Sequence, residues 1–186
     1  VIPASNIPLV TLGAFLLWIG WFGFNGGSVG SIASKENADL VALTIMNTNT
    51  AGLCGAIVVA IIMQIMYKKL DLTMILNGAL GGLVAVTAGP DLYDIYTPIL
   101  IGSVGGILVV IGVSFFDKLK IDDPVGALSV HLLNGIWGTV AVGLFASNGD
   151  DITLLGQLKG IIVVAIFAFV SSYIILYIIN KIMPLR

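Results

Sequence analysis

Six long runs without a charged residue constrain the fold of this chain more than any other feature. They occupy residues 1–34, 40–67, 72–90, 95–116, 124–149 and 160–180. About 20 apolar residues in a helix cross a hydrocarbon core of about 30 Å, so each run is long enough to span a bilayer. Because 58% of the residues are hydrophobic and 10% are charged, the chain has too little polar surface for a soluble domain.

The runs predict an all-α integral membrane protein, a polytopic helical bundle of about six transmembrane helices. We expect one membrane domain over residues 1–186, with helices at about 8–30, 41–66, 72–90, 95–116, 124–147 and 155–181. Lipid provides no hydrophobic force between helices, so close packing at small residues must hold the bundle together. The pairs Gly78/Gly82 and Gly102/Gly106 have the spacing for such packing.

The first run has the features of a helix start and lacks those of a signal peptide. A signal peptide needs a basic residue before its apolar region, and residues 1–34 contain none. Ser5 and Asn6 are suitable helix caps, and Pro8 would fall in the first turn. We therefore expect the first run to remain in the protein as a transmembrane helix.

The basic residues predict the orientation, because successive loops must alternate between the two sides of the membrane. One side receives Lys68, Lys69, Lys118, Lys120, Lys181 and Arg186. The other side receives Lys35 and Lys159, together with acidic residues that include Asp150 and Asp151. By the positive-inside rule the first side, which holds the C-terminal end, is cytoplasmic. We expect a multi-pass protein of the plasma or inner membrane.

Several function classes are disfavoured by what the sequence lacks. It has no P-loop, GxSxG, HExxH or paired-cysteine metal spacing, and Cys54 is the single cysteine. A formal charge of −2 disfavours a nucleic-acid partner. One histidine among uncharged spans offers no acid–base pair and no metal cluster. We predict that the chain is not an enzyme and that it binds no cofactor and no metal.

His131 is the one ionisable side chain near the middle of a predicted span. We expect its helix to begin at Asp122 or Asp123, with a carboxylate cap before Pro124. Eight residues at about 1.5 Å each would then place His131 about 12 Å below that end. A buried histidine is often a structural hydrogen-bonding residue. At membrane depth we favour a pore-facing role, because a neutral imidazole can accept a hydrogen bond or carry a proton.

An aromatic stripe in the first run is a second candidate site. Leu17, Trp21, Phe24 and Ser28 are four, three and four residues apart, so a helix places them on one face. The Ser28 hydroxyl could take a small cation, and the two aromatic rings could hold it by cation–π attraction. The rest of this helix face would then offer only an apolar path. The alternative is packing, or an aromatic belt that anchors the helix at the membrane surface.

Four segments together resemble the second half of the Amt/Rh ammonium transporter family, on the Amt side. They are LLWIGWFGFNGGS, NTNTAGLCGA, NGALGGLVAVTAG and IDDPVGALSVHLLNGIWGTVAVG. The resemblance implies an eleven-helix fold of two inverted five-helix halves plus a last long helix, assembled as a homotrimer with one pore per subunit. The first half of that fold is missing here, so we expect the chain to be part of a longer protein or to have a separate partner.

The resemblance also implies roles for single residues. Phe24 matches the inner aromatic of the external gate, Ser28 the hydroxyl that recruits ammonium, and His131 the second of two pore histidines. Leu17 and Thr87 match positions near the pore wall. The partner histidine, the outer gate aromatic and the external tryptophan belong to the missing half.

The acidic pair and its surroundings match the family less completely. Asp122 and Asp123 match the acidic pair before the histidine helix, for which the resemblance implies a structural role. Gly126 stands where many members carry a third acidic residue, and HLLNG replaces the HGxxG of some bacterial members. We expect these departures to tune function without abolishing it.

The implied function is ammonium transport and nitrogen uptake through a narrow hydrophobic pore. Ammonium, with methylammonium as an analogue, would be recruited and deprotonated at the external mouth, and ammonia would pass along the pore histidine. A PII-type regulator could contact the cytoplasmic face. The alternatives are an ammonium sensor coupled to a cytoplasmic signalling module, and a structural bundle in which His131 only packs.

Overall fold

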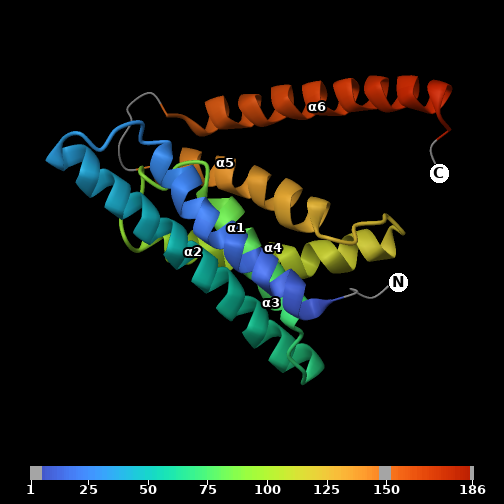
Figure 1. Ribbon diagram of the computed structural model, residues 1–186, viewed down its shortest axis with the longest axis horizontal. Coiled ribbons are helices and arrows are strands. Elements are labelled where there is room, and N and C mark those ends of the chain that lie inside the picture. The colour runs from blue at the N-terminus through green and yellow to red at the C-terminus, as the bar shows by residue number, and fades with distance from the viewer. Residues whose placement is uncertain (1–5, 147–151, 185–186) are drawn as a thin grey trace.

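The computed structural model describes residues 6–146 and 152–184, and within them all regular secondary structure is helical. The elements are α1 (Ile7–Gly27), α2 (Lys35–Tyr67), α3 (Leu72–Val86), α4 (Thr97–Lys118), the π-helical turn η1 (Ala127–Leu132), α5 (Leu133–Phe145) and α6 (Leu154–Ile182). Figure 1 shows the first five α-helices and η1 as one bundle, with α6 beside it. The prediction of an all-α bundle is confirmed.

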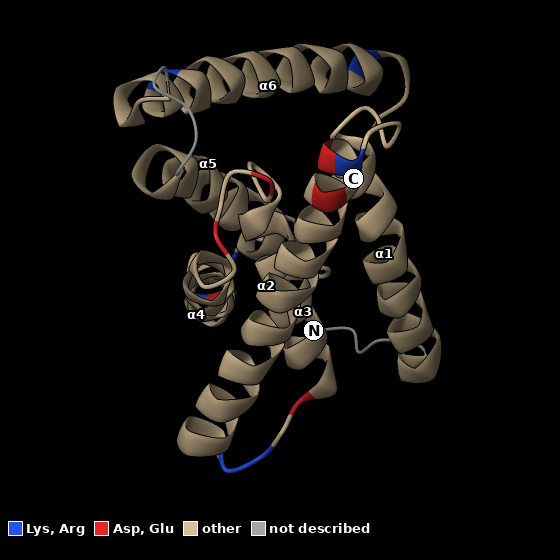
Figure 2. Ribbon diagram, turned by 90° about the vertical axis from the view of Figure 1, so that its left-hand side faces the viewer, with Lys and Arg blue, Asp and Glu red and all other residues tan. Residues whose placement is uncertain are grey.

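Five segments are long and apolar enough to cross a membrane: α1, α2, α4, the continuous stretch Ala127–Phe145, and α6. The sixth helix, α3, is apolar but has only 15 residues. It ends at Val86, whereas the expected span continues to residue 90. Pro90 limits any extension of the helix, because proline disfavours a helical conformation in the residue before it, Gly89. Figure 2 shows the charged residues at helix ends and in connections, with the lengths of the helices uncharged.

Side-chain caps define where the helices begin. Asn6 Oδ1 accepts a hydrogen bond from Leu9 N at 2.9 Å, and Pro8 lies in the first turn of α1. Ser34, Asp71 and Thr153 cap α2, α3 and α6 in the same way. The predicted start of the first helix is therefore confirmed for Asn6 and Pro8, while Ser5 lies outside the described residues.

Helices α2, α3 and α4 pack at glycine contacts, as the spacing of the small residues predicts. A methyl group built on Gly82 would clash with the backbone of Ala51, and one on Gly102 would clash with the same residue. A methyl group on Gly106 would lie 2.6 Å from the carbonyl oxygen of Gly55, and Gly78 lies against that residue too. The three helices are thus in backbone contact, which only residues without a Cβ permit.

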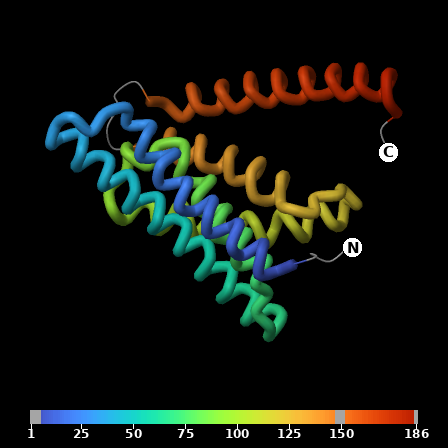
Figure 3. Tube along the Cα trace, viewed as in Figure 1, coloured from blue at the N-terminus to red at the C-terminus, as the bar shows by residue number. Residues whose placement is uncertain are grey.

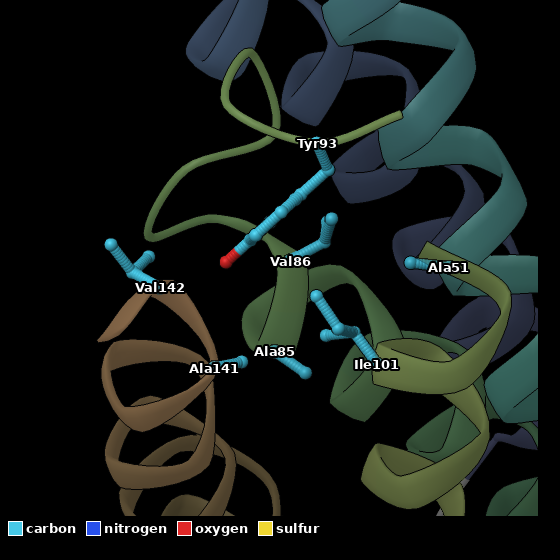
Figure 4. Close-up of a cluster of buried hydrophobic side chains, with 7 residues drawn as sticks. All are labelled: Ala51, Ala85, Val86, Tyr93, Ile101, Ala141 and Val142. Atoms are coloured by element: carbon cyan, nitrogen blue, oxygen red, sulfur yellow. The ribbon is translucent and has the colours of Figure 1, made fainter. Parts of the chain in front are cut away.

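The connection between α3 and α4 is fastened to the bundle core. Asn47 Nδ2 donates to the carbonyl oxygens of Pro90 at 2.8 Å and Tyr93 at 3.2 Å. Figure 4 shows the Tyr93 ring directed from this connection into the core. The core cluster consists of Ala51, Ala85, Val86, Tyr93, Ile101, Ala141 and Val142. The bundle therefore closes around apolar contacts between α2, α3, α4, α5 and this connection.

Helix α6 lies apart from the other helices, as the tube in Figure 3 also shows. In the described chain it packs against α5 alone and contains no buried residue. Its exposed residues are nearly all apolar, for example Phe167, Phe169 and Ile182. A helix that is apolar on every side is suited to lipid or to further protein, and not to water.

The ends of the helices sort onto two sides. The beginning of α1, the connection between α2 and α3, and the ends of α4 and α6 lie on one side, to the right in Figure 1. That side holds Lys68, Lys69, Lys118, Lys120 and Lys181. The α1–α2 and α3–α4 connections lie on the opposite side. Arg186, Asp150 and Asp151 lie outside the described residues.

Candidate functional site

Helix α1 presents its aromatic stripe on an open apolar groove. The groove has a volume of about 320 Å³ and is lined by Leu16, Leu17, Gly20, Trp21 and Phe24. The Trp21 and Phe24 rings meet edge to face, with centroids 6.3 Å apart and planes at 86°. Phe24 is 63% exposed and Leu17 is 56% exposed. The structure thus places three of the four stripe residues together on one accessible surface.

Ser28, the fourth stripe residue, lies at the end of α1 and is not among the residues that line the groove. Its hydroxyl donates to the carbonyl oxygen of Phe24 at 2.8 Å. Because the hydroxyl proton is engaged inside the helix, the oxygen lone pairs remain available to accept a hydrogen bond. The side chain is exposed, so a small cation with N–H groups can reach it.

Thr87 holds the indole of Trp21. Trp21 Nε1 donates to Thr87 Oγ1 at 2.7 Å, and Thr87 Oγ1 donates to the carbonyl oxygen of Leu83 at 2.6 Å. These two partners are 66 residues apart in the chain and come from α1 and from the end of α3. The structure therefore joins two predicted site residues, and it fixes the tryptophan on the wall of the groove.

Asn25 is a site residue that the sequence patterns did not single out. It is only 3% exposed, and its Nδ2 donates to Thr48 Oγ1 at 3.0 Å and to Thr87 Oγ1 at 3.4 Å. The amide thus connects α1 with α2 and α3 beneath the stripe. A signal was present, because an uncharged amide inside an apolar span indicates a hydrogen bond between helices.

His131 lies in η1, where its side chain is exposed while those of Ser129 and Val130 are buried. Among the described residues η1 packs against α3, α4 and α5, but not against α1. The chain by itself therefore does not bring the histidine into contact with the aromatic stripe. His131 and the stripe both present exposed side chains on the surface of the bundle.

The predicted helix start at Asp122 or Asp123 is wrong. Regular structure begins at Ala127, after Gly126 with φ of 78°, and a helix does not run on from Pro124. His131 therefore lies four residues after the start of the helical segment at Ala127, and not eight residues after it as the 12 Å estimate assumed. The positive φ at residue 126 also explains why glycine stands here in place of an acidic residue, because glycine adopts a positive φ without strain.

The Asp123 side chain accepts hydrogen bonds from residues five and six positions later, whereas a normal N-cap bonds two or three positions later. Its carboxylate accepts hydrogen bonds from Leu128 N at 3.1 Å, Ser129 N at 3.0 Å and Ser129 Oγ at 2.9 Å. Burial opposes the charge on Asp123, but these hydrogen bonds outweigh burial and lower the pKa of the carboxyl group. Asp122 is exposed. The carboxylate of Asp123 therefore stabilises the turn that carries His131.

The fold and the site together define a multi-pass α-helical membrane protein with hydrogen-bonded polar groups between its helices. The described residues contain no group of three His, Cys, Asp or Glu side chains that could hold a metal ion. The sequence model of the Ammonium Transporter Family matches residues 1–186. The chain belongs to this family, and the resemblance of its four segments is confirmed.

Curated relatives agree with this assignment. The chain is 40% identical over 172 residues to a putative ammonium transporter of Synechocystis, covering 91% of this chain and 39% of the relative. It is 32% identical over 202 residues to the ammonium transporter Amt2 of Archaeoglobus fulgidus, covering 100% of this chain and 42% of the relative. The chain thus spans less than half the length of these relatives.

Solved structures have the same arrangement of helices. A sensor Amt protein superimposes with a TM-score of 0.89 at 34% identity, covering 98% of this chain and 46% of that one. Mep2 of Saccharomyces cerevisiae superimposes with a TM-score of 0.88 at 28% identity, covering 97% of this chain and 44% of that one. The fold is therefore that of part of an Amt/Mep protein.

Proposed function

We propose that this chain forms the second half of an ammonium transporter. Ammonium is recruited outside at the Ser28 oxygen and the exposed ring of Phe24, and ammonia then moves along the groove of α1 toward His131. The groove itself carries the proposal. Among the side chains that line it, the single polar atom is Trp21 Nε1, and its N–H already donates a hydrogen bond to Thr87 Oγ1.

Such a groove suits a neutral solute better than an ion. An ammonium ion that enters it loses its hydration, and the lining offers no acceptor to replace the water. A charge at the centre of a bilayer costs at least about 3 kcal/mol even on the most lenient scale. The aromatic faces can hold the cation at the mouth by cation–π attraction. Deprotonation there lets ammonia pass, while His131 guides it and can carry the proton.

The other wall of the pore would come from outside these 186 residues. Leu17, Phe24 and His131 are exposed here, and a closed pore requires protein opposite them. The chain also spans less than half the length of the curated relatives reported above. We therefore propose a missing first half, joined in one polypeptide or supplied separately, and a homotrimer of the complete unit.

Intact-mass spectrometry of the purified protein tests this proposal of a missing half. We expect a chain of about twice 19.4 kDa, or a second membrane chain that copurifies in equal amount. A denaturing gel distinguishes these two forms. A functional transporter that contains only the 19.4 kDa chain, in single or repeated copies, would contradict it.

Orientation follows from the same arrangement. The end of the bundle that gathers Lys68, Lys69, Lys118, Lys120 and Lys181 would face the cytoplasm of a plasma or inner membrane, by the positive-inside rule. Ser28 lies at the opposite end, where ammonium would enter. A PII-type regulator would contact the lysine-rich end.

Uptake by vesicles that contain the complete protein tests the transport function. We expect saturable uptake of methylammonium that ammonium inhibits and that potassium at equal concentration does not. Potassium resembles ammonium in size, but it cannot lose a proton and so cannot enter the apolar groove. Empty vesicles give the background. Saturable uptake of potassium itself would contradict deprotonation at the mouth, because potassium has no proton to lose.

An ammonium sensor remains the second candidate, since one of the similar structures is a sensor Amt protein. Two observations favour transport. The curated relatives reported above carry the names of ammonium transporters. The groove also offers a route for a neutral solute as well as a binding surface for a cation. Binding of ammonium without any uptake would favour the sensor.

A further inference from the structure

Ser129, two residues before His131, is held on several sides at once. It is fully buried, and both its backbone N–H and its hydroxyl donate to the carboxylate of Asp123. Its carbonyl oxygen accepts a hydrogen bond from Asn134 Nδ2 at 3.5 Å. A methyl group built on Gly112 would lie 3.1 Å from Ser129 Cα, so the backbone of α4 closes the remaining side.

These contacts surround an unusual backbone turn. Ser129 lies in the middle of η1, where His131 N bonds to Gly126 O at 3.4 Å and Leu133 N bonds to Leu128 O. Both hydrogen bonds span five residues, as in a π-helix. Such turns are rare, occur mostly as single turns within α-helices, and are frequent at functional sites. The hydrogen bonds that Ser129 donates to Asp123 and accepts from Asn134 are well placed to keep this turn open.

The width of the turn determines where the next side chains point. Consecutive residues of an α-helix differ by about 100° in direction, because 3.6 residues make one turn. If η1 tightened to an α-helix, the residues on its two sides would rotate relative to one another by a similar amount. His131, now exposed, would then exchange direction with a neighbour such as the buried Val130.

We propose that Ser129 is a positioning residue that fixes the direction of the His131 imidazole by holding the π-turn open. Ser129 does not touch the substrate, because it is buried between η1 and α4. The proposal rests on the proposed function only in assigning His131 to the pore. The direction of the imidazole can be measured whether or not the protein transports ammonium.

Nuclear magnetic resonance of histidine provides the test. The complete protein that contains this chain is labelled with ¹³C,¹⁵N-histidine and placed in lipid bilayers, and the His131 signals are identified by their loss in His131→Gln. We expect Ser129→Ala and Asp123→Asn to shift or split these signals. Ser171→Ala is the matched control, because in the described chain the Ser171 hydroxyl donates only to carbonyl oxygens of α6, so its loss should leave the signals unchanged.

Methylammonium uptake is measured on the same samples. We expect about a tenfold loss in Ser129→Ala, because a displacement of about 1 Å at an acting group can cost up to about a hundredfold in rate. Unchanged His131 signals in Ser129→Ala overturn the positioning role, whatever happens to uptake. Shifted signals with unchanged uptake support that role and contradict the function of His131 in the pore. If Asp123→Asn does not fold, Ser129→Ala decides alone, since it removes a single hydroxyl.

Discussion

We expect replacement of Gly82 by leucine to abolish assembly of the bundle. The three atoms nearest to a Cβ at this position all belong to the backbone of α2: the carbonyl carbon and oxygen of Ala51, and Gly52 Cα at 3.2 Å. Backbone cannot turn aside as a side chain can, so α2 and α3 must separate along the core. Gly82→Ala tests the same contact with one methyl group and should destabilise the protein by about 1–3 kcal/mol or more. Size-exclusion chromatography and thermal unfolding in detergent measure both effects.

Gly160→Ala is the matched control for this expectation. Apart from its chain neighbours and the nearby backbone of α6, no described heavy atom lies within 4 Å of a Cβ built at Gly160, so the same methyl group enters open space. We expect its elution profile to equal that of the unmodified protein and its melting temperature to be equal or slightly higher, because alanine is favoured over glycine inside a helix by about 0.5–1 kcal/mol. Equal stability of Gly82→Ala and Gly160→Ala would show that close backbone approach does not hold α2 and α3 together.

We expect replacement of His131 by alanine to reduce the ammonium-evoked current of the proposed complete transporter by about a hundredfold. A group that transfers a proton commonly contributes at least that factor in rate. His131→Gln separates two roles, because an amide can donate and accept hydrogen bonds but does not take up a proton near neutral pH. We expect the glutamine variant to retain part of its methylammonium uptake and to lose the accompanying proton flux.

Electrophysiology on supported membranes measures the current, and a pH-sensitive dye inside vesicles measures the proton flux. Each variant must first show the melting temperature of the unmodified protein, since His131 is exposed and its loss should not unfold the bundle. An unchanged current together with unchanged proton coupling in His131→Ala would remove His131 from the mechanism.

Much of the fold could be predicted from local patterns. Charge-free runs identify helices because a bilayer imposes both their length and their composition. Asn6 and Pro8 define a helix start through contacts within a few residues. Gly78 and Gly82 indicate close packing for a similarly local reason, although the sequence does not say which helix they meet.

The failures have equally specific causes. The π-turn at Ala127–Leu132 was missed because the depth estimate, at about 1.5 Å per residue, assumes a regular α-helix from Asp123 onward. Gly126 with its positive φ breaks that assumption, and the carboxylate of Asp123 reaches residues five and six positions away. A cap at that distance has no signature among the usual sequence patterns.

In the candidate site too, features carried by one helix could be predicted, whereas contacts between helices could not. The stripe of Leu17, Trp21 and Phe24 could be predicted because one helix carries it. The bond from Trp21 to Thr87 could not, because its partners are 66 residues apart and meet only when α1 packs on α3. Asn25 was passed over for the same reason, since its partners are on α2 and α3.

The isolation of α6 has a consequence for biogenesis. This helix follows the others in the chain, and within the described structure it packs only against α5. The ribosome therefore releases α1 to α5 first, and their glycine contacts can close before α6 enters the bilayer. Its own length and apolar composition are enough for insertion. Packing of α1 to α4 therefore does not have to wait for α6, because among the described helices only α5 contacts it.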